Sequence, residues 1–264
     1  MIKKSIFKKK ALVILLTPFL FHGCDKPNDP EPSSFCWFTS SVLKDGPYTT
    51  RYNLVYEDDK LISSTSTAES TNGSSSTATS SYTYNSAGNL SEIISSFREV
   101  FTYTDSEITK REKFNSSNTL LYQTDYEYSN GQLIKIQEYS RSATGMTKDA
   151  YTTFEYATPS IMTPVRSKFF ASPSDPNPTS TSSYEFSFLK TAFGAAPPAV
   201  QKYFKITQQY TENPISKSET NQGGKVSTVS YTYELNADGY PTKRTERDVL
   251  GVELRTTTYA YSCN

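Results

Sequence analysis

The residue types most often used for catalysis are sparse in this chain of 264 residues. Its single histidine, His22, lies in an N-terminal segment that we expect to be removed. Catalytic triads that need an imidazole base, and metal sites built on histidine, therefore have no candidate in the remaining chain. Gly223 and Gly224 form only an isolated pair, which is not a phosphate-binding loop. We therefore expect neither a cofactor nor a metal site.

Carboxylates are the remaining groups that could act as acid and base. A pair of Asp or Glu side chains facing each other across a cleft can hydrolyse a glycosidic bond. Here the acidic residues mostly lie in turn segments or alternate with Lys and Arg. The densest group, Glu57-Asp58-Asp59, lacks the spaced ligands of a calcium-binding loop. The sequence favours a protein that is not an enzyme, with a carboxylate-only glycoside hydrolase as the alternative.

The three cysteines indicate covalent chemistry of another kind. Cys24 follows five lysines and an apolar run at residues 11–21, which is too short to cross a bilayer, since a spanning helix needs about 20 residues. With Gly23, this cysteine resembles the lipobox of bacterial lipoproteins, although Phe21 and His22 replace the usual residues. The resemblance implies a signal peptide at residues 1–23 and lipidation of Cys24. An ordinary secretory signal and an uncleaved anchor are the alternatives.

The segment after Cys24 and the two remaining cysteines complete this interpretation. Residues 24–35 contain three prolines and favour an extended, flexible tether. Cys36 and Cys263 lie near the two ends of an exported domain, where disulfides persist. A bond between them would close a loop for which the entropy model gives about 5 kcal/mol of stabilisation. We predict this disulfide, with two buried free thiols as the alternative.

Net charge argues against one class of partner. The whole chain has 27 basic and 27 acidic residues, and five of the lysines precede Cys24 without any acid. The chain from Cys24 onward therefore carries a net charge of −5, and no block of basic residues remains in it. Because phosphate binding needs clustered Lys and Arg, we expect no nucleic-acid partner.

The secondary structure of the domain is indicated by a repeated sequence motif. The motif consists of Tyr-x-Tyr, then a turn segment, then an aliphatic residue. It is clearest at residues 82–93, 126–133 and 231–240, where Gly88, Gly131 and Gly239 occupy the turn. Aligned aromatic residues recur about every 26 residues, a period typical of repeat architectures. The aligned positions are Tyr56, Tyr84, Tyr103, Tyr128, Tyr156, Phe186, Tyr210, Tyr233 and Tyr261. Each unit predicts one β-hairpin.

This phrase resembles the YD repeat of Rhs-type and wall-associated proteins, and the chain is similar to Bacteroidetes-type envelope lipoproteins that carry such hairpins. Asn85, Ser129 and Glu234 replace the Asp of the YD phrase. The resemblance implies antiparallel hairpin architecture and no particular activity. We predict a single all-β domain at residues 36–264, an antiparallel meander of consecutive hairpins forming a long, twisted and curled sheet. A closed barrel or a propeller is the alternative, because closure removes exposed sheet edges.

Two segments depart from the regular pattern. Residues 63–81 are nearly all Ser, Thr, Gly, Asn and Ala, which favours a solvent-facing strand pair over a glycosylated loop. Residues 157–203 are interrupted by prolines, with a short helical turn possible at residues 198–204. Phe169, Phe170 and Phe193 lie in this insert and are the candidate ligand-binding face, or else plug one end of the sheet.

These observations together indicate a lipid-anchored protein of the cell envelope, at the outer membrane, with a non-catalytic binding or scaffolding role. The expected partners are the membrane, through Cys24, and a glycan or an envelope protein, because tyrosine offers a flat apolar face with a polar tip. A purely structural envelope protein, whose sheet edge pairs with another chain, is a further alternative.

Overall fold

The computed structural model describes residues 36–158, 163–187, 190–208 and 213–263. The expected signal peptide, the tether and Cys24 lie outside these residues, as does Tyr210. The domain boundaries proposed above therefore stay a prediction. The side chains of Phe193 and Cys263 are also outside the description, although their backbone positions are given.

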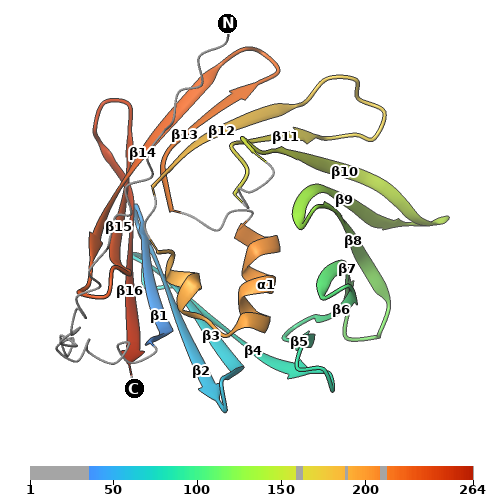
Figure 1. Ribbon diagram of the computed structural model, residues 1–264, viewed down its shortest axis with the longest axis horizontal. Helices are drawn as coiled ribbons and strands as arrows, with labels where there is room; N and C mark the ends of the chain where they lie inside the picture. The colour runs from blue at the N-terminus through green and yellow to red at the C-terminus, as the bar shows by residue number, and fades with distance from the viewer. Residues whose placement is uncertain (1–35, 159–162, 188–189, 209–212, 264) are drawn as a thin grey trace, which may run out of the picture. The chain divides into compact units, whose positions relative to one another are not determined.

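The described chain is almost entirely β-structure (Figure 1). The strands are β1 (Cys36–Asp45), β2 (Tyr48–Glu57), β3 (Lys60–Ser70), β4 (Ser75–Tyr84), β5 (Leu90–Ile94), β6 (Arg98–Thr104), β7 (Glu107–Phe114), β8 (Leu120–Ser129), β9 (Gln132–Ser142), β10 (Gly145–Glu155), β11 (Arg166–Phe170), β12 (Ser180–Ser187), β13 (Asn213–Asn221), β14 (Val226–Leu235), β15 (Pro241–Asp248) and β16 (Glu253–Cys263). A short 3-10 helix, η1 (Ala192–Ala195), and an α-helix, α1 (Pro198–Gln208), separate β12 from β13.

Consecutive strands pair with each other in antiparallel fashion, and β1 also pairs with β16 to close a barrel. The closing register runs from Cys36 opposite Cys263 to Asp45 opposite Arg255. The predicted all-β, antiparallel class is therefore confirmed, and so is the closed-barrel alternative. The open, curled sheet is wrong, because pairing of the first and last strands leaves neither of them as a free edge.

The repeated phrase builds the hairpins at one rim of the barrel. Each aligned aromatic residue that is described lies within two residues of the C-terminal end of an even-numbered strand, from Tyr56 on β2 to Tyr261 on β16. Tight turns follow, and Asn130 and Gly131 both adopt positive φ between β8 and β9. In longer turns the side chain of the first turn residue stabilises the loop. Asn85 Oδ1, for example, accepts hydrogen bonds from the backbone N–H groups of Ala87 and Asn89. Local turn chemistry thus explains why neighbouring strands pair.

The second aromatic residue of the phrase links neighbouring hairpins inside the barrel. In five of the repeats its hydroxyl donates a hydrogen bond of 2.7 to 3.0 Å to a backbone carbonyl of an earlier strand. The pairs are Tyr84 to Leu61, Tyr103 to Leu90, Tyr156 to Leu133, Tyr233 to Pro214 and Tyr261 to Pro241. Tyr56 and Tyr128 differ, because their buried hydroxyls have no such partner among the described residues. In the five paired tyrosines the hydroxyl is hydrogen-bonded and the aromatic ring packs in the interior, which is the usual arrangement of a buried tyrosine. The repeated tyrosines therefore hold the barrel together.

Helix α1 lies inside the ring of strands (Figure 1). Its Ile206 packs in one apolar cluster with Leu90, Phe101 and Ile108 from the wall. Its Val200 packs in another with Leu61. A helix surrounded by wall on several sides needs apolar residues on more than one face. The prolines at its start suit the first helical turn, where a missing N–H costs nothing.

The buried tyrosines predict loss of stability in alkali. Burial raises the pKa of Tyr84, Tyr103, Tyr126 and Tyr156 to about 12 each. Because the unfolded chain titrates near its ordinary value of 10, the folded state holds these protons more tightly, and the resulting stability is present below pH 10. We expect it to be lost progressively as pH rises from about 10 to about 12. Tyrosinate absorbance and circular dichroism should change together over that range. Titration near pH 10 with the fold intact would contradict the assignment.

Candidate functional site

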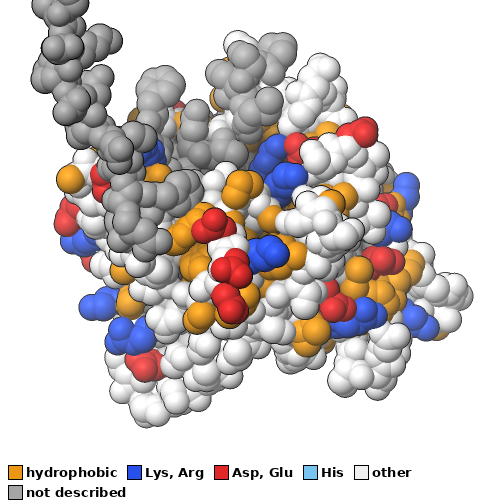
Figure 2. Space-filling model, turned by 60° about the horizontal axis from the view of Figure 1, so that its bottom comes forward, with side chains coloured by type: hydrophobic (Ala, Val, Ile, Leu, Met, Phe, Trp, Pro, Cys, Tyr) orange, Lys and Arg blue, Asp and Glu red, His pale blue; other side chains and the backbone are white. Residues whose placement is uncertain are grey.

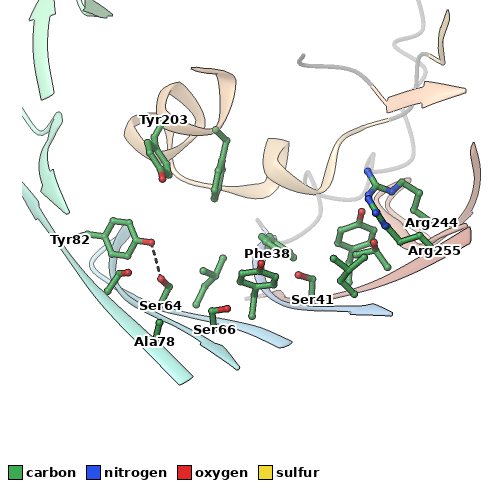
Figure 3. Close-up of a pocket in the computed structure, with 16 residues that line it drawn as sticks. Phe38, Ser41, Ser64, Ser66, Ala78, Tyr82, Tyr203, Arg244 and Arg255 are labelled. Atoms are coloured by element: carbon green, nitrogen blue, oxygen red, sulfur yellow. Dashed lines mark hydrogen bonds between the residues drawn. The ribbon is translucent and has the colours of Figure 1, made fainter. Parts of the chain in front are cut away.

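A cavity of about 430 Å³ lies inside the barrel, between α1 and the wall formed by β1–β4, β15 and β16 (Figure 3). Tyr203 and Phe204 reach it from the helix, and Tyr82 reaches it from β4. Its volume lies within the range of small-molecule sites, which combine apolar walls with a few polar groups. This cavity is therefore the candidate functional site.

Small side chains on two neighbouring strands create the space. Ser64 and Ser66 on β3, and Ala78 and Ser80 on β4, all face the cavity. Elsewhere in the barrel, Leu90, Phe101 and similar residues pack in one cluster with Ile206 of α1. A second hollow of about 320 Å³ lies between the end of α1 and strands β7–β10. The polar stretch at residues 63–81 forms the expected strand pair, β3–β4, and its inward positions are what leave the cavity open.

Aromatic rings line the cavity near the helix. Tyr203 is fixed on its other side by an edge-on contact with Phe101, with ring centroids 5.7 Å apart. Tyr82 is oriented by Ser64, whose hydroxyl lies 2.8 Å from the phenolic oxygen (Figure 3). Burial raises the pKa of both tyrosines above the ordinary value, so both rings are neutral at physiological pH. Neutral, positioned rings of this kind suit contact with a flat or apolar ligand surface.

The cationic end of the cavity is formed by Arg244 on β15 and Arg255 on β16 (Figure 3). The Arg244 guanidinium lies 5.6 Å from the ring centroid of Tyr231. Arg255 Nη2 donates a hydrogen bond of 2.8 Å to Asp45. No Asp or Glu is among the described residues that line this cavity. The site thus combines aromatic rings, serine hydroxyls and two guanidinium groups.

A separate cleft of about 250 Å³ brings two carboxylates together. Glu138 and Asp149 line it with Arg111 and Lys113. Burial is the main cause that raises the pKa of Glu138, Arg111 opposes the rise, and Asp149 adds to it. Within the described ranges, no group of three or more His, Cys, Asp or Glu side chains is arranged to hold a metal ion. The two acids therefore share this cleft with two cations, which themselves form ion pairs with Glu99.

The phenylalanines singled out from the sequence do not form one face. Phe169 and Phe170 are consecutive in β11, so their side chains point to opposite sides of the sheet. Phe169 is 37% exposed, whereas Phe170 is 9% exposed and stacks on Tyr151 with centroids 4.3 Å apart. Phe193 lies in η1, and its side chain is outside the description. A role for any of the three in ligand binding stays a prediction.

The cavity was not found from the sequence, because its signal is the absence of large side chains. Tyr82 belongs to the repeated phrase, Tyr203 to the proline-interrupted insert, and the small residues to the polar stretch at 63–81, but none of them was proposed as a site residue. The two arginines carry no motif. Their common position follows from the pairing of β15 with β16, which brings residues from neighbouring strands to one face.

Comparison with known proteins gives a fold relationship. No protein-family model matches the chain. No curated protein matches it either. A helix of the length and apolarity needed to cross a membrane was not found among the residues that the structure describes.

Two solved structures match this chain over most of its length, to different degrees. A porin-like protein from Bacteroides uniformis ATCC 8492 is 15% identical, with a TM-score of 0.60 over 88% of this chain and 99% of that chain. A porin-like protein from Bacteroides vulgatus ATCC 8482 is 12% identical, with a TM-score of 0.37 over 86% of this chain and 98% of that chain. The chain therefore shares its barrel fold with the protein from Bacteroides uniformis.

Proposed function

We propose that this chain is a lipid-anchored barrel of the cell envelope that binds a small amphiphilic molecule in its lumen and does not transform it. The observation that carries this proposal is the cavity beside α1, with aromatic rings at one end and hydroxyl groups along β3 and β4. The carboxylate cleft at Glu138 offers less support for hydrolysis, because Arg111 and Lys113 lie beside both acids.

The outer wall favours contact with water, and Figure 2 shows basic and acidic side chains scattered over the face of the molecule in view. Strand neighbours of lumen-facing residues must point outward, because side chains alternate along a strand. Several of these outward residues form ion pairs that are partly exposed to solvent. The pairs are Arg51–Glu69, Arg98–Glu92, Lys135–Glu127, Arg166–Glu155 and Lys243–Glu234. A barrel embedded in lipid carries an apolar outer band instead, and an Arg or Lys at mid-bilayer costs about 2–4 kcal/mol.

Membrane attachment is therefore assigned to Cys24 rather than to the strands. The structural neighbour from Bacteroides uniformis is described as porin-like, and that description supports an envelope location for this chain. Here the helix inside the ring favours a closed binding barrel over an open pore (Figure 1).

The disulfide proposal gains support from the register of barrel closure. Cys36 and Cys263 are directly opposite each other where β1 meets β16. Residues opposite each other in antiparallel strands are about 4.5–5.5 Å apart at their Cα atoms, which suits a disulfide. We expect mass mapping of the exported protein without reductant to find one peptide that links these residues. Two freely alkylated thiols in that protein would contradict the proposal.

Filling the cavity provides the test of the binding function. The probe is phenylnaphthylamine, a neutral amphiphile whose fluorescence rises in apolar surroundings. Ser66→Trp places a large ring in the cavity, so we expect its affinity for the probe to fall at least about tenfold. Ser81→Trp is the matched control, because Ser81 is exposed and lies next to the cavity-facing Ser80.

Both variants need to keep the wild-type thermal midpoint within a few degrees for this comparison. Equal affinity of Ser66→Trp, Ser81→Trp and the wild-type protein for the probe would contradict lumen binding. Ala78→Trp, on the neighbouring strand, serves as a second filling variant if Ser66→Trp fails to fold.

A further inference from the structure

We infer that the lumen site selects anionic amphiphiles, with the anionic group held between Arg244 and Arg255. This inference rests on the binding function proposed above and adds the class of ligand. The ligand would have an apolar or ring-shaped body and a carboxylate, sulfonate or sulfate at one end. Each of these groups accepts hydrogen bonds from guanidinium in the forked geometry that favours arginine over lysine.

Strand register places the two arginines together. Arg244 is directly opposite Thr257, and Arg255 lies two residues before Thr257 on the same strand. Two residues along a strand return to the same face, so the arginines are diagonal neighbours on the lumen side. Diagonal neighbours are about 7–8 Å apart, which long side chains bridge easily. Figure 3 shows both side chains directed into the cavity from this part of the wall.

The guanidinium of Arg255 is only partly satisfied. Its Nη2 group is paired with Asp45, while its Nε–H is buried and has no acceptor among the described residues. Glu246 is opposite Arg255 in the strand register, so carboxylates lie close to this end of the site. Neither Asp45 nor Glu246 lines the cavity. Both carboxylates are directly opposite Arg255 on the neighbouring strands and so share its lumen-facing side of the sheet. They limit the strength of the attraction for an anion at this cation-bordered end of the cavity.

The opposite end of the cavity has a different character. Tyr82 and Tyr203 lie there with Phe204, as Figure 3 shows for the two labelled tyrosines, and Leu54 adds an aliphatic surface. These side chains can bury the body of a ligand, at roughly 25 cal/mol for each Å² of apolar surface removed from water. Phe38, Tyr52 and Tyr259 continue the aromatic lining along the wall, whereas the cations are confined to one end. The anionic group of an amphiphile therefore has one favourable place, and that group orients the molecule.

A matched pair of probes separates the charge from the body. Anilinonaphthalene sulfonate and phenylnaphthylamine share the same fused and pendant rings, and only the first carries a sulfonate. We expect the full-length protein to bind the sulfonate about tenfold more tightly. In Arg244→Gln/Arg255→Gln this preference should fall to about one, while phenylnaphthylamine binding stays unchanged. The control is Arg51→Gln, which removes a cation from the outer wall and should keep the preference.

The outcomes distinguish the two proposals. Equal affinity of the wild-type protein for both probes, with both lost in Ser66→Trp, would overturn the anion selectivity and leave the lumen site intact. A preference that persists in the double arginine variant would also overturn it. If Ser66→Trp binds phenylnaphthylamine as well as the wild-type protein does, lumen binding itself fails. Where the double variant unfolds, the single variant Arg244→Gln is used, and we expect it to lower the preference at least threefold.

Discussion

Replacement of Leu61 by alanine is expected to lower the free energy of unfolding by about 2–5 kcal/mol, the range measured for buried leucine in other proteins. Leu61 is 1% exposed and packs against Val200 of α1, and its backbone carbonyl accepts the hydroxyl of Tyr84. The shortened side chain would leave a hole between the wall and the internal helix. Chemical denaturation followed by circular dichroism measures the loss.

Val55→Ala is the matched control on the neighbouring strand. Val55 is 50% exposed, so truncating it removes little buried surface, and we expect a change below about 1 kcal/mol. Equal effects of the two substitutions would show that the interior contacts of α1 do not stabilise the barrel. That result would remove the physical basis for a fixed lumen cavity.

Residues 25–264, exported behind an ordinary cleavable signal, are expected to be folded and monodisperse in buffer without detergent. The full chain, with Cys24, should instead be recovered almost entirely with membranes. The reason is the outer wall, where pairs such as Arg98–Glu92 and Lys135–Glu127 are more favourable in water than in lipid. A single acyl chain binds membranes only marginally, so stable attachment needs the several chains expected on a bacterial lipoprotein cysteine.

Fractionation followed by size-exclusion chromatography measures this difference. Metabolic labelling with a palmitate analogue, present on the full chain and lost on Cys24→Ser, tests the attachment itself. A shortened chain that aggregates in buffer and folds only in micelles would contradict the water-facing wall. Membrane retention of the full chain without any label would contradict the lipid anchor.

The hairpins were predictable because their signals are local. Tyr82 and Tyr84 directly precede the turn that contains Asn85 and Gly88. All the information for the pairing of β4 with β5 lies within about a dozen residues. The sequence did not decide between an open sheet and a closed barrel, because the two strands that close the barrel, β1 and β16, are separated by nearly the whole domain. The one hint in the sequence was the pair of cysteines near the two ends of the domain, which the structure places directly opposite each other where β1 meets β16.

The internal helix was only partly predicted. A short helical turn at residues 198–204 was expected, and α1 extends from Pro198 to Gln208. Val200, Tyr203 and Phe204 follow the i, i+3, i+4 spacing of one helical face, with Ile206 beside them. The helix has only 11 residues and begins among prolines, so this short pattern predicted a turn and not the whole helix.

The site was missed because a cavity depends on what surrounds small residues. In the sequence, Ser64, Ser66 and Ala78 belong to a featureless polar stretch. They acquire significance only when the helix from the distant insert faces them. Arg244 and Arg255 were ordinary charged residues until the strand register placed them on one face. Phe169 and Phe170 were proposed as site residues because they are aromatic residues in a mostly polar insert. Consecutive residues of a strand point to opposite sides of the sheet, so the two side chains do not share a face.

The most direct test of a tethered, water-facing barrel is collisional quenching at the outer wall of the lipidated protein in vesicles. Thr79 lies between the cavity-facing Ala78 and Ser80, so it points outward from the middle of β4. Thr79→Trp combined with Trp37→Phe, which removes the single native tryptophan, gives one reporter. We predict strong quenching by aqueous iodide and almost none by lipids with brominated acyl chains. Quenching by the brominated lipids with protection from iodide would place the wall in the bilayer and contradict the proposal.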